Sequence, residues 1–112
     1  MVAQSQEEVC RRFGAPFAAV APDEKVGISA NVSSSSWPVH GLRHPAQGDT
    51  SGWYIWAGEF KGESSFFQPL HARHLVERCP EVLKYLGLAP GWRFLIAPDH
   101  ENVWYDESLL KV

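Results

Sequence analysis

Three aromatic rings and an isoleucine occupy four consecutive positions in the middle of this chain, from Trp53 to Trp56. Gly52 precedes the run and Gly58 follows it shortly afterwards. Such a run is too short for a helix, and it is too bulky on both faces for a surface strand. We therefore predict that the segment from Trp53 to Ala57 is a central β-strand covered on both sides.

The bulk properties of the chain narrow its class. Its 112 residues suit one domain, and no break in composition divides them, so a single domain over residues 1–112 is expected. The net charge of −3 argues against a nucleic-acid-binding surface, which requires clustered Lys and Arg. Cys10 and Cys79 lie in no metal-type spacing, which predicts free, buried thiols in a reducing compartment. No signal peptide or membrane span is recognisable, so a cytoplasmic protein without membrane contact is expected.

The N-terminal third of the chain predicts one helix and one strand. Ser5 and Glu8 have the spacing of a capping box, and Gly14 suits the position after a helix end. This pattern predicts an amphipathic helix over about residues 5–13. Residues 26–30 then alternate apolar with small side chains, which is the period of a strand.

A second helical pattern follows the aromatic run. Pro69 suits the first turn of a helix, Pro80 ends it, and a further short helix is predicted over residues 81–86. The apolar stripe of the longer helix consists of Ala72, Leu75, Val76 and Cys79.

The C-terminal part of the chain predicts two strands, over residues 92–97 and 103–106, joined by a hairpin loop over residues 98–102. Together these elements indicate an α+β fold. We predict a mostly antiparallel sheet of about four strands, with short helices packed mainly on one face. The core of the domain is expected within about residues 25–110.

Residues 32–51 form the longest stretch without periodicity, and a loop of this length in a compact domain is usually functional or flexible. The stretch contains Trp37, His40, Arg43 and His44. Aromatic residues with an arginine on a loop are typical of a protein-binding hot spot. The alternative is that Trp37 closes the edge of the sheet, and the sequence favours neither interpretation.

Two other groups of residues have the chemistry of a site. His71 and His74 bring two imidazoles to one side of the predicted helix, and Glu59 is a carboxylate at a strand end. No third ligand has a recognised spacing, so two histidines that hydrogen-bond a neighbouring loop are favoured over a metal site. The chain shows no nucleophile elbow and no phosphate-binding glycine loop. No catalytic residue, metal or cofactor is therefore predicted.

Four segments of the sequence resemble small bacterial domains of the immunity-protein thirty-three type, which are catalogued among the antidotes of polymorphic-toxin systems. They are residues 41–45, 49–59, 91–95 and 103–106, and the resemblance extends over roughly residues 25–110. The pattern S-G-W-x-x-W-x-G-E, which begins at Ser51, is the most specific part. The family pattern places an aspartate directly before Ser-Gly-Trp, whereas Thr50 separates Asp49 from Ser51 here.

The resemblance implies an α+β domain without catalytic activity that binds and blocks a partner toxin inside the producing cell. The residues predicted to contact such a partner are Trp37, His40, Arg43, His44 and Asp49. The alternative is a small-molecule-binding or metal-binding domain with hydrolytic activity, whose pocket would be lined by His71, His74 and Glu59.

Overall fold

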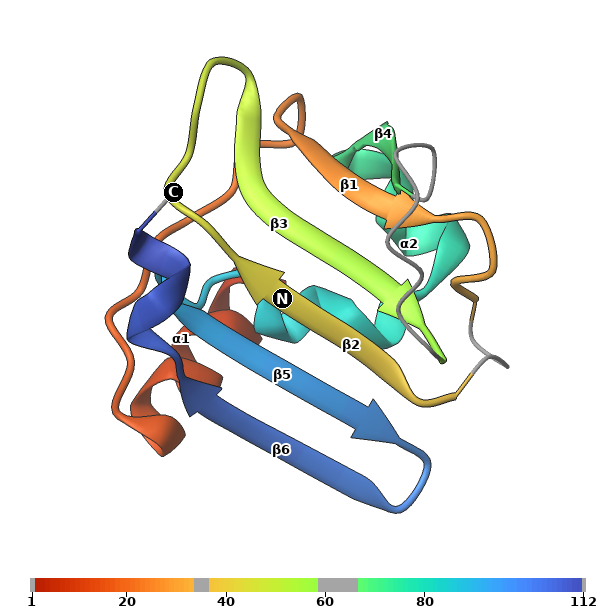
Figure 1. The fold of residues 1–112 in the computed structure, drawn as a ribbon. Helices are drawn as coiled ribbons and strands as arrows, with labels where there is room; N and C mark the ends of the chain where they lie inside the picture. Colours follow the sequence, from red (N-terminus) through yellow and green to blue (C-terminus); the bar gives the residue numbers. More distant parts are fainter. Residues whose placement is uncertain (1, 34–36, 59–66, 112) are drawn as a thin grey trace.

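The computed structural model describes residues 2–33, 37–58 and 67–111 (Figure 1). The strands in this part of the chain are β1 (Lys25–Ser29), β2 (Val39–Arg43), β3 (Thr50–Ala57), β4 (Phe67–His71), β5 (Trp92–Ala97) and β6 (His100–Tyr105). The helical segments are α1 (Val2–Phe13), η1 (Ala72–His74), α2 (Leu75–Arg78), η2 (Pro80–Tyr85) and η3 (Glu107–Leu110), of which the three η segments are 3-10 helices.

The strands form one sheet in the order β4-β1-β3-β2-β5-β6. The pair β1–β3 is parallel and the other neighbouring pairs are antiparallel, so the sheet is mixed. The predicted α+β class is confirmed, and the aromatic run lies in a central strand, as predicted. The prediction of about four mostly antiparallel strands is imprecise, because the described chain holds six strands and one of the pairings is parallel.

One of the unpredicted strands is β2, which lies inside the stretch of residues 32–51 that was predicted to be irregular. Val39, Gly41 and Arg43 are buried on the side of the sheet that faces the core, opposite residues of β3. Of these three residues only Val39 has an apolar side chain. The alternation of buried and exposed residues in this strand therefore does not appear as an alternation of hydrophobic and polar residues. The prediction of a long loop is therefore wrong for residues 39–43.

The other unpredicted strand is β4, which contains Pro69. This residue was predicted to begin a helix, but it lies opposite Gly27 in an antiparallel pair at the edge of the sheet. An edge strand accepts proline because one row of its backbone N–H groups makes no ladder bond. Helical structure begins only at Ala72 and runs to Arg78, the end of α2. A separate 3-10 helix, η2, begins at Pro80.

The last two strands form a tighter hairpin than predicted. β5 ends at Ala97 and β6 begins at His100, so Pro98 and Asp99 make the turn in place of the predicted loop over residues 98–102. Two-residue turns match the twist of paired strands. β6 is an edge strand, and most of its side chains are exposed or partly exposed. Its first residues are therefore polar, and this polarity is typical of a loop in the sequence.

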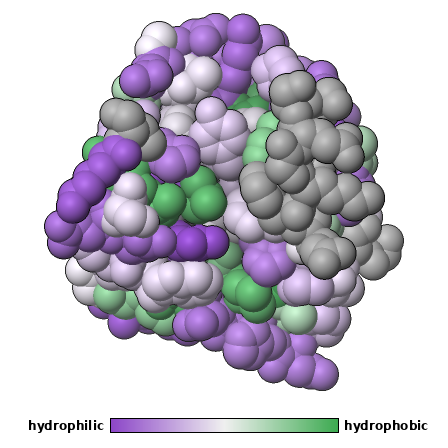
Figure 2. All heavy atoms as spheres, in the orientation of Figure 1, coloured by the Kyte–Doolittle hydropathy of each residue, from purple (hydrophilic) through white to green (hydrophobic). Residues whose placement is uncertain are grey.

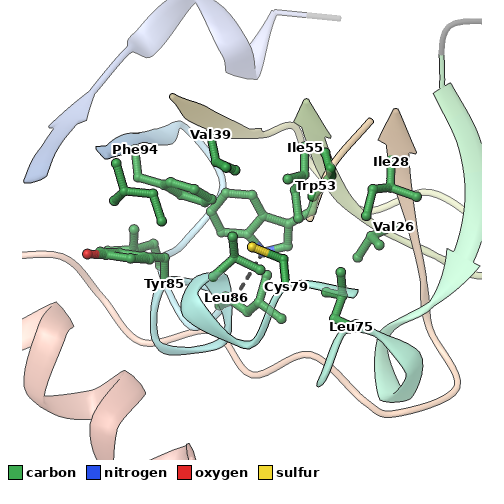
Figure 3. Close-up of a cluster of buried hydrophobic side chains, with 14 of the residues drawn as sticks. Val26, Ile28, Val39, Trp53, Ile55, Leu75, Cys79, Tyr85, Leu86 and Phe94 are labelled. Carbon is green, nitrogen blue, oxygen red and sulfur yellow. Dashed lines mark hydrogen bonds between the residues drawn. The ribbon is translucent and has the colours of Figure 1, made fainter. Parts of the chain in front are cut away.

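The core lies between the sheet and the helical segments. In Figure 1 the strands lie in front of α1 and of the helical residues that follow β4. Figure 3 shows side chains from the strands, including Trp53 and Phe94, meeting Leu75, Cys79 and Leu86 from the helical layer. Val9 and Cys10 of α1 belong to the same buried cluster. The described helical segments that form this layer thus cover one face of the sheet, and the other face is described below.

Candidate functional site

The second face of the sheet is the one that the described helices α1 and α2 and the segment η2 do not cover, and we call it the helix-free face; Trp56, which lies on it, is only 6% exposed. Side chains alternate along a strand, so Trp53 and Ile55 point into the core whereas their neighbours on β3 point to the helix-free face. The register of the strands places His40, Leu42, Tyr54, Trp56, Leu95 and Trp104 on this face. Figure 2 shows this side of the molecule, where green and white side chains lie near the middle and purple ones lie both around them and between them.

Aromatic rings interlock on the helix-free face. The imidazole of His40 stacks on the Trp56 indole with a centroid distance of 5.0 Å and an interplanar angle of 11°. The Phe67 ring meets Tyr54 and Trp56 edge to face, at 5.2 and 6.1 Å. The ring of His44 contacts Tyr54 in the same manner at 5.6 Å. Edge-to-face geometry is the favoured arrangement of aromatic pairs, so these rings form an ordered cluster.

The cluster forms much of the wall of a pocket with a volume of about 380 Å³. Its apolar lining consists of Leu42, Pro45, Tyr54, Trp56 and Phe67. Its polar side chains are those of His44, Gln47 and Thr50. The described part of the lining therefore has no ionised carboxylate, ammonium or guanidinium group.

A backbone contact fixes the orientation of His44 at this pocket. Its Nδ1 lies 2.9 Å from the carbonyl oxygen of Leu109 in η3. A carbonyl oxygen only accepts hydrogen bonds, so Nδ1 carries the proton and donates it. In the neutral ring Nε2 is then an acceptor. The C-terminal η3 segment thus sets the polarity of one side of the pocket.

The described charged residues on and around the helix-free face form two ion pairs, Lys25 with Asp49 and Arg93 with Asp106. Arg93 lies 5.3 Å above the Trp104 ring, and its Nη1 bonds the carboxylate of Asp106 at 3.2 Å. Within the described residues the Nε of Arg93 has no hydrogen-bond partner. Burial first, and then the positive charge of Arg93, lower the pKa of His40. The neutral imidazole of His40 is therefore the favoured form against Trp56.

The remaining residues predicted to contact a partner lie in three different places. Asp49 is exposed in the turn before β3, where it makes a 2.8 Å ion pair with Lys25. Arg43 is only 4% exposed, and its side chain points into the core. Its guanidinium donates hydrogen bonds to the carbonyl oxygens of Ala18, Ser51, Leu86 and Leu88. Arg43 therefore holds the fold together from the covered side of the sheet.

Trp37 lies at a different concavity, a groove of about 950 Å³ between α1, η2 and the β5–β6 hairpin. Its ring is half-buried and packs against the core. In the same groove Glu101 accepts hydrogen bonds from Tyr85 at 2.5 Å and from Arg12 at 2.7 Å. The structure thus brings His40 and His44 together on the helix-free face, and it separates Trp37 and Arg43 from them.

The pocket suggested by His71, His74 and Glu59 is only partly described. The rings of His71 and His74 are 6.2 Å apart, and His74 lies 3.8 Å from Glu77. Glu59 lies outside the described residues. Across the ranges that the structure describes, no group of three or more His, Cys, Asp or Glu side chains is placed to hold a metal ion.

Sequence reasoning did not select Leu42, Tyr54, Leu95 or Trp104 as site residues. The signal that would have found Tyr54 is the alternation of β3, in which Tyr54 and Trp56 must share a face. The same signal in β2 was hidden, because Gly41 and Arg43 occupy its core-facing positions.

The structure defines an α+β domain, in which one side of a mixed sheet carries the core and the other carries an ordered aromatic cluster. The chain belongs to the family of the Imm33-like domain, whose model matches residues 5–106. No curated protein and no solved structure matches it. Among the described helices, none combines the length and the apolar composition needed to cross a membrane.

Proposed function

We propose that this protein is a non-enzymatic toxin-immunity protein, which binds a toxin inside the producing cell and blocks its action. Membership of the Imm33-like family supports this class of function. We further propose that the toxin docks on the helix-free face, through the region that contains His40, His44 and the aromatic pocket.

The observation that carries the choice of surface is the ordered aromatic cluster on a sheet face that the helical layer does not cover. Aromatic residues are enriched where proteins bind each other, because they bury a large area at a small cost in side-chain entropy. Among the described residues, Lys25 is paired with Asp49 and Arg93 with Asp106, so a partner can cover these groups without leaving one of their charges unpaired. Asp49 lies at the border of the same surface, where a polar rim is expected.

A co-expression experiment tests this function. A toxin whose gene neighbours that of an Imm33-like domain is produced in a bacterial host, with and without this protein, and growth and co-purification are measured. We expect the wild-type chain to restore growth and to elute with the toxin as one complex. Failure to restore growth, with no complex formed, would overturn the proposed function.

Two substitutions of an apolar residue by glutamate test the choice of surface. Leu95 is half-buried on the helix-free face, opposite His40, whereas Val76 is 54% exposed on α2 in the helical layer. We expect Leu95→Glu to lower toxin affinity by at least about tenfold, since it introduces an unpaired charge into the interface. Val76→Glu makes the same chemical change on the opposite side of the molecule and is expected to leave affinity unchanged. The reverse pattern would place the interface on the helical layer.

A further inference from the structure

We propose that the aromatic pocket on the helix-free face receives the guanidinium group of an arginine side chain of the toxin. This inference rests on the proposed function, because it states the chemistry of the partner at the same surface. It makes the complex depend on one anchoring residue, in the way that hot spots on two partners commonly pair.

The walls of the pocket suit a planar cation. Tyr54, Trp56 and Phe67 contribute three aromatic rings to the lining. The centroid of the Phe67 ring lies 5.2 Å from that of Tyr54 and 6.1 Å from that of Trp56. The face of an aromatic ring is electron-rich and attracts a cation that lies over it. A guanidinium group also stacks on such a ring, since it is planar and more weakly hydrated than an ammonium group.

The polar side chains of the pocket include several hydrogen-bond acceptors. Nε2 of His44 is an acceptor, because Nδ1 carries the proton that bonds Leu109. The hydroxyl of Thr50 donates its proton to the backbone carbonyl of Gln47 at 2.8 Å, which leaves the oxygen lone pairs of Thr50 for a ligand. The side-chain amide of Gln47 adds a carbonyl oxygen. A guanidinium group has five N–H donors and no acceptor, so it can pair with each of these acceptors.

The charge of the chain points to the same ligand. The described lining contains no cationic side chain, and Lys25, which lies opposite Thr50 in the sheet, is paired with Asp49. An acidic side chain entering the pocket would lose its hydration without gaining a strong donor, which is unfavourable. The net charge of −3 attracts a basic partner from a distance. A volume of about 380 Å³ holds one long side chain and a few water molecules.

Capped amino acids test the ligand without the toxin. N-acetyl-arginine methylamide is titrated into the whole isotope-labelled protein, and the indole N–H signal of Trp56 is followed by NMR together with the signals of Tyr54. N-acetyl-citrulline methylamide has nearly the same shape without the charge, and the lysine derivative has the charge without the planar group. We expect saturable shifts at Trp56 and Tyr54 with the arginine probe, and binding roughly 2- to 30-fold tighter than that of the citrulline probe.

Two variants of one exposed residue change the charge at the rim of the pocket. Gln47→Glu is isosteric and adds a carboxylate, and Gln47→Lys adds an ammonium group at the same position. We expect the first variant to tighten binding of the arginine probe several-fold and the second to weaken it, with little change for the citrulline probe. Val76→Glu and Val76→Lys, on exposed α2, control for the change in net charge and are expected to leave both probes unaffected.

Equal affinity for the arginine and citrulline probes would overturn the inference, as would equal affinity for the lysine probe. Shifts confined to other tryptophans, or Gln47 variants that do not act in opposite directions, would overturn it too. The toxin separates this failure from failure of the proposed function. A toxin that is neutralised equally well by Gln47→Lys and by the wild-type chain contradicts the arginine anchor alone. An arginine probe that binds as expected, beside a toxin that is never neutralised, contradicts the immunity function alone.

Discussion

The guanidinium of Arg43 and the indole of Trp53 donate hydrogen bonds to the same carbonyl oxygen, that of Leu86, at 3.3 and 3.0 Å. The guanidinium carbon also lies 5.7 Å from the centroid of the Trp53 ring. Both residues come from neighbouring strands, and Leu86 follows η2 in the helical layer. The shared carbonyl thus joins the sheet to its cover at the centre of the core (Figure 3).

Replacing Arg43 is expected to destabilise the protein strongly. Arg43→Met removes the donors to four backbone carbonyls, two of which, those of Ala18 and Leu88, lie 2.8 Å from Nη1. We expect a loss of about 3 kcal/mol in the free energy of unfolding, because a buried acceptor left without a donor costs about 1–3 kcal/mol. Urea denaturation measures this loss.

Arg43→Lys separates charge from geometry. It keeps the charge, but all of its donors sit on one nitrogen, so it cannot span the same carbonyls and is expected to lose stability as well. Arg73→Met, at an exposed position, is the control and should stay within about 0.5 kcal/mol of the wild type. An Arg43→Met variant as stable as Arg73→Met would show that the guanidinium bonds contribute nothing to the fold.

Gly52, in the most specific part of the family pattern, is expected to tolerate no side chain. Its φ is +90°, and an added Cβ would lie 1.9 Å from the carbonyl oxygen of His44, a backbone atom that cannot yield. Gly52→Ala should therefore cost several times the roughly 1–2 kcal/mol of a positive φ alone. Gly48, with a φ of +60° and open space around it, provides the matched control, and Gly48→Ala should cost only that smaller amount. Thermal unfolding of the two variants gives the comparison, and equal losses would contradict the predicted clash.

The strands that sequence reasoning found are those whose own residues carry the apolar signal. β3 was predicted because consecutive large apolar side chains fit only a buried strand. The strand β2 was not predicted, because residues distant in sequence pack beside Gly41 and Arg43 at its core-facing positions. The ring of Phe94 occupies the space over Gly41, where a Cβ would lie 2.2 Å from the ring. Arg43 is accommodated by carbonyls between 8 and 45 residues away. No local pattern contains that information.

The candidate site was predicted only in part for the same reason. His40 and His44 were predicted as partner contacts because they share the aperiodic stretch with Trp37 and Arg43, and they do lie on one face of the sheet. Their neighbours in the cluster, above all Phe67, come from a strand that was predicted to be helical. The tautomer of His44 depends on Leu109, which is 65 residues away. The order of the strands brings these residues together, so they cannot be grouped from the sequence before that order is known.

Glu101 is expected to make the stability of the protein fall at acidic pH. Partial burial acts to raise the pKa of Glu101, but hydrogen bonds from Tyr85 and Arg12 together outweigh it, so the pKa is lowered. A carboxyl group with a lowered pKa contributes stability above its unfolded pKa, about 4.3, and loses that contribution as the pH falls through its folded value. We expect Glu101→Gln to lower the free energy of unfolding by about 1–2 kcal/mol at pH 7.

The difference between Glu101→Gln and the wild type should shrink at pH 3, where the carboxyl group of the wild type takes up a proton. Urea denaturation of both proteins at pH 7, 5 and 3 measures it. Glu107→Gln, at an exposed position in η3, is the control for the loss of one negative charge. A difference that stays constant over this range would contradict the assigned role of the ionised carboxylate.

His40 is expected to add a second pH dependence, nearer neutrality. Its pKa is lowered by burial and then by Arg93, so the unfolded chain binds a proton more readily than the folded one. The stability due to this residue is therefore complete above the unfolded pKa of about 6.5, and it is lost as the pH falls toward the folded value. His40→Phe keeps a ring against Trp56 and cannot titrate, so its free energy of unfolding should change less than that of the wild type between pH 7.5 and 5.5. His100→Gln, at an exposed position of β6, should follow the wild type. A His40→Phe variant that also followed the wild type would mean that protonation of His40 does not act on the fold.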